Sequence, residues 1–550
     1  MKKDKLKPKL FSVMKTYSKE QFVKDVVAGI IVAIIALPLS IALALASGVG
    51  PEQGIYTAII AGFLISFFGG SRVQIAGPTA AFATIVAGIV AAKGMDGLII
   101  ATIIAGVLLV LMGLLRLGSL IKFIPYTITT GFTAGIAVTI LIGQLKDFMG
   151  LTYPAGTVTI ETMEKVRAVV ENIGTINLQA VIVGVVCLIV LIICPRINDK
   201  IPGSLVAVIV GILMVKVLGM HVNTIGDLYS ISNRLPTLHV PAFTLQTIRD
   251  GFSDGITIAI LAAIESLLSC VVSDSMINSR HRPDMELIAQ GIGNMGSALF
   301  GGIPATGAIA RTAANIKNGG RTPVAGMVHS IVLVLVLVVL MPYAAMIPMP
   351  TIAAILFLVA YNMSGWRTFV HLVKTAPVGD ILVLVITFVL TVVFDLVVAI
   401  EVGMLITVVL FMKSMSDRTE VRGWKYIDDS SDTESIELRK VPEGVHVYEI
   451  NGPMFFGAAD LISTITLKEH TKVMIIRMRA VPDVDATAMH SLEQLADKCL
   501  ASGAKIIFSH VNEMPYKAME KAGLVAKVGA EYFCPSIDAS LKKAESLVAE

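Results

Sequence analysis

Between Val26 and Met412 the chain is a succession of apolar segments separated by short polar breaks. A helix needs about 20 apolar residues to cross the hydrocarbon core of a bilayer. Of the 550 residues, 55% are hydrophobic and 15% are charged, whereas soluble domains carry about 25% charged residues. The sequence therefore predicts a polytopic α-helical membrane protein, and it excludes a water-soluble enzyme, a disordered chain and a fibrous chain.

The apolar segments number fourteen, and several of them, notably 79–91 and 306–316, are too short to cross a bilayer alone. The expected spans are 26–46, 54–68, 79–91, 97–115, 123–144, 178–194, 203–219, 254–272, 285–299, 306–316, 323–341, 350–361, 379–394 and 396–412. Lysine and arginine are more frequent in the breaks on the N-terminal side of the membrane. By the positive-inside rule, and because the count is even, both termini are expected in the cytoplasm of an inner or plasma membrane.

The expected domain organisation follows from the change in composition along the chain. Residues 1–25 are basic, show no signal peptide and form a cytoplasmic N-terminal segment. The transporter domain spans 26–412, and a polar linker spans 413–436. Strand-like and helix-like runs alternate over 437–550, which indicates a small cytosolic α/β domain.

Two breaks have the same pattern and lie about 230 residues apart, at matching places in two seven-span halves. They read GGSRVQIAGPTAA (69–81) and GGIPATGAIART (301–312). Matched interruptions of this kind indicate an inverted-repeat transporter. A half-helix that begins inside the membrane leaves its first N–H groups unpaired, so two facing half-helix starts form a pocket for an anion. The alternative is that the breaks only kink packed helices.

Two charged residues stand within these apolar surroundings. Arg311 is expected one and a half turns into the second short helix, where it either holds an anion or braces the scaffold through a carboxylate. Glu265 is expected near mid-membrane, with Ser269 one turn later on the same face. A lone carboxylate there suits proton coupling, or Na⁺ binding together with Ser269, whereas the alternative is a structural hydrogen bond or an ion pair with Arg311.

Several classes of function are not supported by the sequence. A net charge of +3 gives no reason to expect nucleic acid, and the five cysteines form no C-x-x-C pair. No nucleophile–base set and no phosphate-binding glycine loop is visible, so we expect neither an enzyme nor a protein-bound cofactor or metal other than a coupling ion.

Four stretches together resemble a bacterial member of the SulP family of anion transporters. They are Ala28–Tyr56, Gln74–Phe82 (QIAGPTAAF), Ala263–Asp274 (AIESLLSCVVSD) and His281–His329. The resemblance continues into the C-terminal part, which is similar to a STAS domain, and so covers essentially the whole chain.

The resemblance implies a fourteen-span, seven-plus-seven inverted repeat with core and gate domains, assembled as a homodimer. It implies an anion site between the third and tenth spans, with Arg311 beside it and Ser40 contributing from the first span. The two faces of that site would be Thr79, Ala80 and Ala81, opposite Ala308, Ile309 and Ala310. Glu265, with Ser269, matches the position associated with proton or cation coupling.

Two positions depart from the family pattern. Many relatives carry glutamine after the first-span proline, where this chain has Leu39; this keeps sulfate, bicarbonate and C4-dicarboxylates open as substrates. In the STAS part, Thr487 stands where soluble STAS regulators have a phosphorylatable hydroxyl, although a simple helix-capping region is the alternative.

We therefore expect a secondary active anion transporter that works by alternating access, most simply as a proton symporter. The alternatives are a Na⁺ symporter, an uncoupled anion exchanger or channel, a nucleobase permease of the same architecture, and a membrane-anchored regulator acting through its STAS domain. The expected partners are a small anion, the lipid bilayer, a second copy of the chain and a cytosolic protein at the STAS domain.

Overall fold

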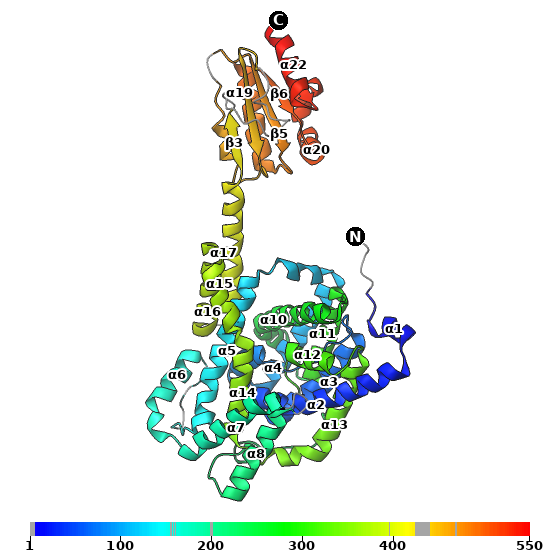
Figure 1. Cartoon of the computed structure of the whole chain (residues 1–550), viewed down its shortest axis with the longest axis vertical. Coiled ribbons are helices and arrows are strands. Elements are labelled where there is room, and N and C mark those ends of the chain that lie inside the picture. Colours follow the sequence, from blue (N-terminus) through cyan, green and yellow to red (C-terminus); the bar gives the residue numbers. More distant parts are fainter. Residues whose placement is uncertain are drawn as a thin grey trace. The chain divides into compact units, whose positions relative to one another are not determined.

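The computed structural model describes residues 6–154, 157, 159, 161–197, 202–394, 396–423, 441–467 and 470–549. The chain divides into two compact units, Met1–Met404 and Leu405–Glu550. The first unit is helical apart from one short strand pair, and the second contains a five-stranded sheet (Figure 1).

Each of the fourteen predicted apolar segments coincides with a helix, and α4 accounts for two of them because Gly94 (φ 68°) interrupts it. These helices are α2 (Lys19–Ala46), α3 (Pro51–Phe68), α4 (Ala83–Leu114), α5 (Tyr126–Met149), α7 (Leu178–Ile197), α8 (Gly203–Leu218), α10 (Leu245–Ile277), α11 (Pro283–Leu299), α12 (Ile309–Lys317), α13 (Val324–Ala344), α14 (Met349–Ser364), α16 (Val378–Val393) and α17 (Leu396–Asp417). Within the described part of the chain, nine helical segments are long and apolar enough to cross a membrane alone, whereas α8 and α16 are shorter.

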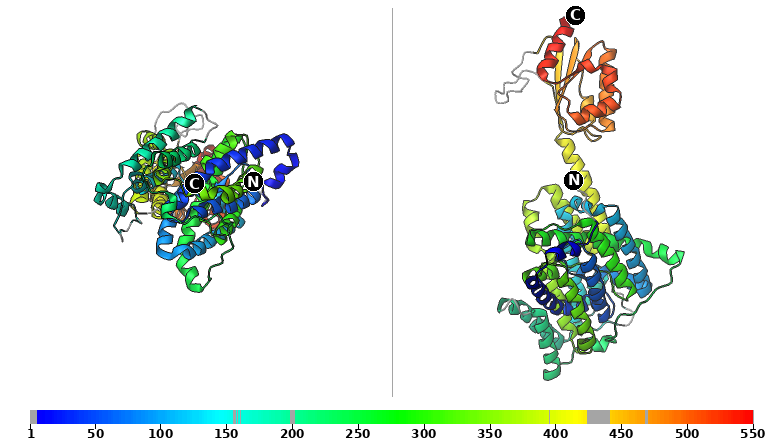
Figure 2. Two further views of the ribbon diagram at one scale, coloured as in Figure 1. Left: turned by 90° about the horizontal axis from the view of Figure 1, so that it is seen from below. Right: turned by 90° about the vertical axis from the view of Figure 1, so that its right-hand side faces the viewer.

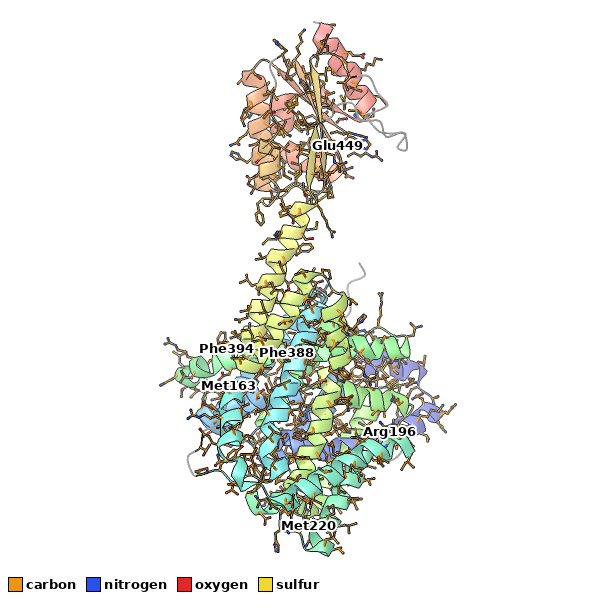
Figure 3. All side chains as sticks on the ribbon, turned by 60° about the vertical axis from the view of Figure 1, so that its left-hand side comes forward. Met163, Arg196, Met220, Phe388, Phe394 and Glu449 are labelled. Atoms are coloured by element: carbon orange, nitrogen blue, oxygen red, sulfur yellow. The ribbon has the colours of Figure 1, made fainter. Side chains whose placement is uncertain are left out.

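The remaining helices of the first unit are short. They are α1 (Leu10–Val13), α6 (Thr162–Glu171), α9 (Ile225–Leu228), α15 (Trp366–Thr375) and the 3₁₀ turns η1 (Met14–Thr16), η2 (Ala80–Phe82), η3 (Leu117–Phe123) and η4 (Ile173–Thr175). On α16, the ring of Phe388 lies 5.3 Å from the ring of Phe369 in α15, and Figure 3 labels Phe388 beside Phe394.

Local sequence signals explain where the long helices begin and end. The Ser18 side chain accepts a hydrogen bond from the Gln21 N–H (3.1 Å) and caps α2. Pro283 starts α11, where its missing N–H costs nothing. Gly150 ends α5 in the left-handed conformation (φ 62°), which glycine adopts without strain.

The two halves of the first unit pack on each other reciprocally. The helix α4 packs against α10 and α11, and α13 packs against α2 and α3. Glycines allow these close crossings: a Cβ on Gly255 of α10 would stand 2.6 Å from Ile104 Cγ2, and a Cβ on Gly29 of α2 would stand 2.6 Å from the Ala325 carbonyl oxygen of α13. The fourth apolar segment of each half therefore contacts the first two segments of the other half, as two-fold related repeats should.

The second unit is a mixed sheet between helical layers. Its strand order is β3-β4-β5-β6-β7, antiparallel between β3 and β4 and parallel elsewhere; the strands are β3 (Glu420–Gly423), β4 (Val445–Asn451), β5 (Val473–Ala480), β6 (Lys505–Ser509) and β7 (Phe533–Cys534). The helices are α18 (Asp460–Ser463), α19 (Ala486–Ala501), α20 (Glu513–Lys521), α21 (Leu524–Val528) and α22 (Ile537–Ala549), with the 3₁₀ turn η6 (Ala530–Tyr532).

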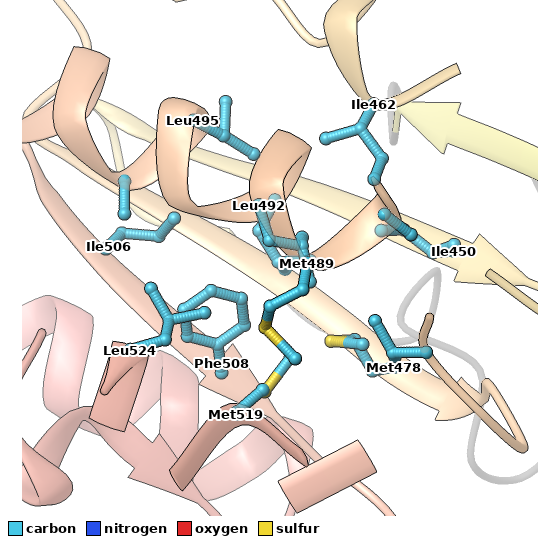
Figure 4. Packing of buried hydrophobic residues seen from close by; sticks show 14 of the residues in the cluster. Ile450, Ile462, Met478, Met489, Leu492, Leu495, Ile506, Phe508, Met519 and Leu524 are labelled. Atoms are coloured by element: carbon cyan, nitrogen blue, oxygen red, sulfur yellow. The ribbon is translucent and has the colours of Figure 1, made fainter. Parts of the chain in front are cut away.

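Alternating side chains of β5 build the two cores of this sheet. Met474 and Ile476 pack with α19, α20 and α21 in the cluster drawn in Figure 4. Val473 and Ile475 point to the opposite face and pack with α22. The period-2 pattern thus covers both sheet faces with helices, as expected for parallel strands.

The sheet contains one strand and one ion pair that were not predicted from the sequence. The strand β3 lies within residues 413–436, the stretch predicted as a linker, and pairs with β4. Glu449 of β4, labelled in Figure 3, forms an ion pair with Arg477 of β5 (Oε1–Nη1 3.3 Å).

Candidate functional site

The two predicted breaks meet inside the first unit. Residues Ala76–Gly77 (β1) pair antiparallel with Thr306–Gly307 (β2), with Ala76 opposite Gly307 and Gly77 opposite Thr306. One further backbone hydrogen bond, from the Ala308 N–H to the Ile75 carbonyl (2.9 Å), continues this pairing. The chain then turns into η2 and α4 after β1 and into α12 after β2, so two helix starts flank a single short ladder.

The second short helix begins later than the sequence suggested. The predicted segment 306–316 is α12, Ile309–Lys317, because Thr306 and Gly307 are used by the strand pairing. The prediction that Arg311 lies one and a half turns into the helix was therefore wrong: Arg311 is in the first turn. The N–H groups of Ile309, Ala310 and Arg311 have no acceptor within the helix, whereas Thr312 N–H bonds to the Ala308 carbonyl (2.9 Å).

Glu265 of α10 connects both breaks. Its Oε2 accepts hydrogen bonds from Thr79 Oγ1 (2.8 Å) and from Thr306 Oγ1 (3.0 Å). On the same helix, Ser266 Oγ accepts from the Gly307 N–H (3.2 Å). The carboxylate therefore bridges one residue of each break, and Glu265 forms no ion pair with any residue that the structure describes.

Ser269 does not share these hydrogen bonds. Its hydroxyl is buried and has no hydrogen-bond partner among the described residues. Thr306, which the sequence analysis did not select, occupies the position beside Glu265 that we had expected for Ser269. The sequence signal for Thr306 was its place in the second break, directly after Pro304-Ala305.

Arg311 is held by the first span and by the first break. The guanidinium is buried, and Nη2 donates to Ser40 Oγ (3.3 Å) and to the Pro78 carbonyl (3.2 Å). Nη1 has no partner in the described part of the chain, and Gly77 leaves room for it, since any Cβ there would overlap this nitrogen. No described carboxylate pairs with Arg311, so neither the ion pair with Glu265 nor a carboxylate brace is found.

The other predicted anion contacts differ in exposure. Ser40, Ala80 and Ala81 are buried, whereas Thr79 and Ala308 are half-buried. Ile309 is 47% exposed and Ala310 is also exposed. Ile309 and Ala310 thus form the exposed part of the first turn of α12, whereas the buried Ser40 contacts Arg311.

A stripe of polar residues on α11 fixes the loops before each ladder strand. Glu286, Gln290 and Asn294 follow one another at intervals of four residues and are all fully buried. Glu286 accepts from the Gly70 N–H (2.8 Å) and the Ser71 N–H (3.0 Å) of the first break, and from Gln74 Nε2 (2.8 Å) and Gln290 Nε2 (2.9 Å).

The second break is held by the same stripe. Asn294 donates Nδ2–H to the Ala305 carbonyl (2.9 Å) and accepts from the Ala305 N–H (2.8 Å). This stripe was not predicted, although the four-residue spacing of its polar residues in the sequence indicates one face of a helix.

Coordination of a transition metal is not supported. In the described ranges no group of three or more His, Cys, Asp or Glu side chains could hold a metal ion. Around Glu265 the available ligands are the oxygens of a carboxylate and of hydroxyls, a set that suits a proton or a hard cation such as Na⁺.

In the second unit, Thr487 is exposed in the first turn of α19. Asp485 caps this helix: Oδ1 accepts from the Ala488 N–H (2.8 Å) and Oδ2 accepts from the Phe456 N–H (2.8 Å). The hydroxyl of Thr487 therefore lies beside a helix start whose cap is already occupied.

Comparisons with known proteins agree with this architecture. Residues 22–387 match the model of the sulfate permease family, and residues 438–544 match the STAS domain. The chain is 39% identical over 529 residues to "Putative sulfate transporter YvdB" of Bacillus subtilis, covering 94% of this chain and 97% of that protein. It is 31% identical over 540 residues to "Bicarbonate transporter BicA" of Picosynechococcus, covering 94% of each.

Solved structures show the same fold. The transmembrane domain of a cyanobacterial bicarbonate transporter BicA aligns with a TM-score of 0.63 at 30% identity, over 70% of this chain and 98% of that one. The overall structure of SLC26A9 aligns with a TM-score of 0.86 at 17% identity, over 98% of this chain and 92% of that one. The predicted fold is confirmed, and the chain belongs to the sulfate permease family as a multi-pass membrane protein with a C-terminal STAS domain.

Proposed function

We propose that the protein is a proton-coupled symporter of small anions that binds its substrate at the start of α12 and its coupling proton at Glu265. The observation that supports this most is the carboxylate bridge to Thr79 and Thr306, because it joins both breaks through a single titratable oxygen. The α12 N–H groups that lack helical acceptors, together with the adjacent Arg311, favour an anion at the other end of the same site.

The coupling follows from hydrogen-bond polarity. An ionised Glu265 can only accept, so both threonine hydroxyls must donate to it. When the proton is on Oε2, Glu265 instead donates one hydrogen bond to a threonine hydroxyl, and that hydroxyl must then turn its own proton to another acceptor. Thr306 has such an acceptor in the Gly307 carbonyl (3.3 Å). A proton on Oε2 of Glu265 thus changes the hydrogen bonding of a threonine in one of the two breaks.

The substrate is proposed to be sulfate, bicarbonate or a C4-dicarboxylate. Relatives described as sulfate and bicarbonate transporters support the first two. Leu39 leaves the dicarboxylate open, because its side chain offers no hydrogen bond to distinguish one anion from another. Alternating access of the core against the gate, a homodimer in an inner or plasma membrane, both termini in the cytoplasm, and regulation or partner binding at the STAS domain through Thr487 belong to the same proposal.

Na⁺ symport is the second candidate, and one observation favours it. Ser269 presents a buried hydroxyl one turn from Glu265, with no partner among the described residues, and Na⁺ prefers a carboxylate surrounded by such oxygens. Uncoupled exchange or channel conduction would require no titratable group at this bridge.

The test is labelled-anion uptake into proteoliposomes, with sulfate, bicarbonate, fumarate and succinate offered in turn. Wild type, Glu265→Gln and the control Glu401→Gln, whose carboxylate is exposed on α17, are compared with an inward proton gradient, with an inward Na⁺ gradient and with neither. We expect proton-driven uptake in wild type and in the control, and its loss in Glu265→Gln.

Each other outcome selects an alternative. Uptake driven only by Na⁺ and lost in Glu265→Gln would assign the site to Na⁺. Equal gradient-independent uptake in all three proteins would refute coupling through Glu265 and favour exchange or conduction. No uptake of any anion by well-folded wild type would refute the transport proposal.

A further inference from the structure

The N-terminal elbow, residues 6–24, consists of α1, η1 and the beginning of α2. It stands out from the helices of the first unit in both Figure 1 and the left view of Figure 2. Its outer side chains are apolar and exposed, although all of them precede the first predicted span at residue 26. They are Leu6 (41% exposed), Phe11 (45%), Met14 (48%), Phe22 (50%) and Val23 (59%).

The elbow is fixed to two loops of the unit and does not behave as a loose tail. The Lys9 N–H bonds to the Gly69 carbonyl (2.8 Å), and Lys9 Nζ bonds to the Arg280 carbonyl (2.7 Å). Arg282 donates Nη2–H to Ser12 Oγ (3.0 Å) and Nη1–H to the Lys7 carbonyl (2.7 Å). Gly69 opens the first break, so the elbow is attached to the segment that leads to the candidate site.

Aromatic packing places the elbow at the end of a membrane helix. The Phe11 ring meets the Phe67 ring edge-on at 6.0 Å, and Phe67 stacks with Phe63 one turn earlier in α3 at 6.3 Å. Phe67 is next to the last residue of α3, where the apolar span ends. Phe11 therefore lies at the depth of the bilayer–water boundary, the level at which aromatic rings concentrate.

Positive charge accompanies these apolar side chains. Lys7, Lys15 and Lys19 are exposed on the elbow and form no ion pair with any described residue, whereas the exposed Lys24 and Glu20 neutralise each other at 2.6 Å. Exposed apolar residues and unneutralised lysines at boundary depth are the combination with which peripheral helices bind anionic lipids.

We propose that the N-terminal elbow binds the anionic phospholipid headgroups of the leaflet it faces. Phe11 and Met14 enter the headgroup–acyl boundary, and Lys7, Lys15 and Lys19 contact the phosphates. The elbow thereby ties the segment before the first break to the membrane surface. This binding does not depend on which anion the protein transports, or on whether it transports one.

The experiment measures lipid contact in the full-length protein. Phe11→Trp is made in a chain whose two native tryptophans, Trp366 and Trp424, are replaced by Phe, and the protein is placed in nanodiscs. Fluorescence of the introduced indole is recorded while phosphatidylglycerol or phosphatidylcholine, each brominated on the acyl chains, replaces the unlabelled lipid. The measured quantity is the mole fraction of brominated lipid that gives half-maximal quenching.

We expect phosphatidylglycerol to reach half-maximal quenching at a mole fraction at least about fivefold lower than phosphatidylcholine, since each basic residue near an anionic surface contributes about a fivefold preference. Replacing Lys7, Lys15 and Lys19 by Gln should abolish the difference. A matched triple replacement in the STAS domain, of the exposed Lys498, Lys521 and Lys542, should retain it.

Three results would overturn the proposal. If both lipids quench the introduced indole equally in the protein with its native elbow lysines, the elbow has no preference for anionic headgroups. Quenching of the introduced indole by aqueous iodide and by neither lipid would place the elbow in water, as a protein-binding surface would be. If the preference for phosphatidylglycerol is lost equally in both triple variants, and each variant elutes and melts like the parent, the preference arises from net charge alone.

Discussion

Gly54→Ala tests whether the close packing of α3 on α2 holds Ser40 in place for Arg311. A Cβ at residue 54 would overlap the Ser40 carbonyl oxygen and stand 2.9 Å from Ala44 Cβ, and ordinary contact begins at 3.4 Å. The two helices must therefore separate by at least about 0.5 Å, the difference between these two distances, and the closer overlap with the Ser40 carbonyl oxygen requires more. The Arg311–Ser40 hydrogen bond is already 3.3 Å long, so a displacement of Ser40 away from Arg311 by this amount would lengthen it to about 3.8 Å or more and break it.

The expected loss of stability is the balance of three effects. Overpacking costs about 1–3 kcal/mol, and loss of a hydrogen bond from a charged group costs about 1.5–3 kcal/mol. Replacing glycine by alanine within a helix returns about 1 kcal/mol. We expect a net destabilisation of about 1.5–5 kcal/mol, which corresponds to a melting temperature lower by about 3–10 °C at about 2 °C per kcal/mol for a large domain.

The assay is thermal unfolding of the purified protein in detergent, followed by intrinsic fluorescence and by the monodisperse fraction on size exclusion. The matched control is Gly143→Ala in α5, where no heavy atom lies within 4 Å of the new Cβ. The control should melt at or slightly above the wild-type temperature. If Gly54→Ala melts at the same temperature as this control, the packing argument for Ser40 and Arg311 is refuted.

Three further predictions concern other parts of the chain. Asn294→Leu removes both hydrogen bonds to Ala305, and we expect a loss of about 2–5 kcal/mol in the same melting assay; an unchanged melting temperature would show that the second break does not need this clamp. Asp485→Ala removes the cap of α19 and should lower the stability of the STAS domain by about 1–2 kcal/mol, and an equal effect of Thr487→Ala would contradict this assignment. Burial raises the pKa of the Cys499 thiol to about 11, so at pH 7 almost no reactive thiolate is present and its fraction grows only as the pH rises toward 11; peptide mass spectrometry after maleimide treatment should find Cys499 unmodified in the folded protein and modified after unfolding, and rapid modification at pH 7 without unfolding would refute the burial argument.

Much of the fold could be predicted because membrane-spanning helices depend on local composition. Apolar segments long enough to span a bilayer must be helical, and each predicted segment has a helix. The meeting of the two breaks could also be anticipated, because the matching glycine–proline patterns at 69–81 and 301–312 imply equivalent positions in two repeats.

The contacts around the site could not be read in the same way, because they join residues far apart in the sequence. Thr306 reaches Glu265 only because it pairs with Gly77 while its neighbour Gly307 pairs with Ala76, and that pairing also moves the start of α12 to Ile309. In the sequence Glu286 is one acidic residue at a helix start, yet its partners include backbone groups more than 200 residues earlier. No local sequence pattern indicates from which distant N–H group a buried carboxylate accepts a hydrogen bond.

The short ladder between the breaks constrains their length as well as their composition. Side chains alternate across a strand, so Thr306 faces Glu265 whereas Gly307 faces the Gln74 amide, where even a Cβ would overlap it. Inserting or deleting one residue before Ala76 in the first break would exchange Ala76 and Gly77 and place a Cβ against Arg311 Nη1. Inserting or deleting one residue before Thr306 in the second break would exchange Thr306 and Gly307. Glycine would then face the carboxylate, and threonine would be forced against Gln74. A break of this kind tolerates some changes of residue but no change of residue count, so single-codon insertions and deletions at 69–79 and 301–309 should be far more damaging than most substitutions there.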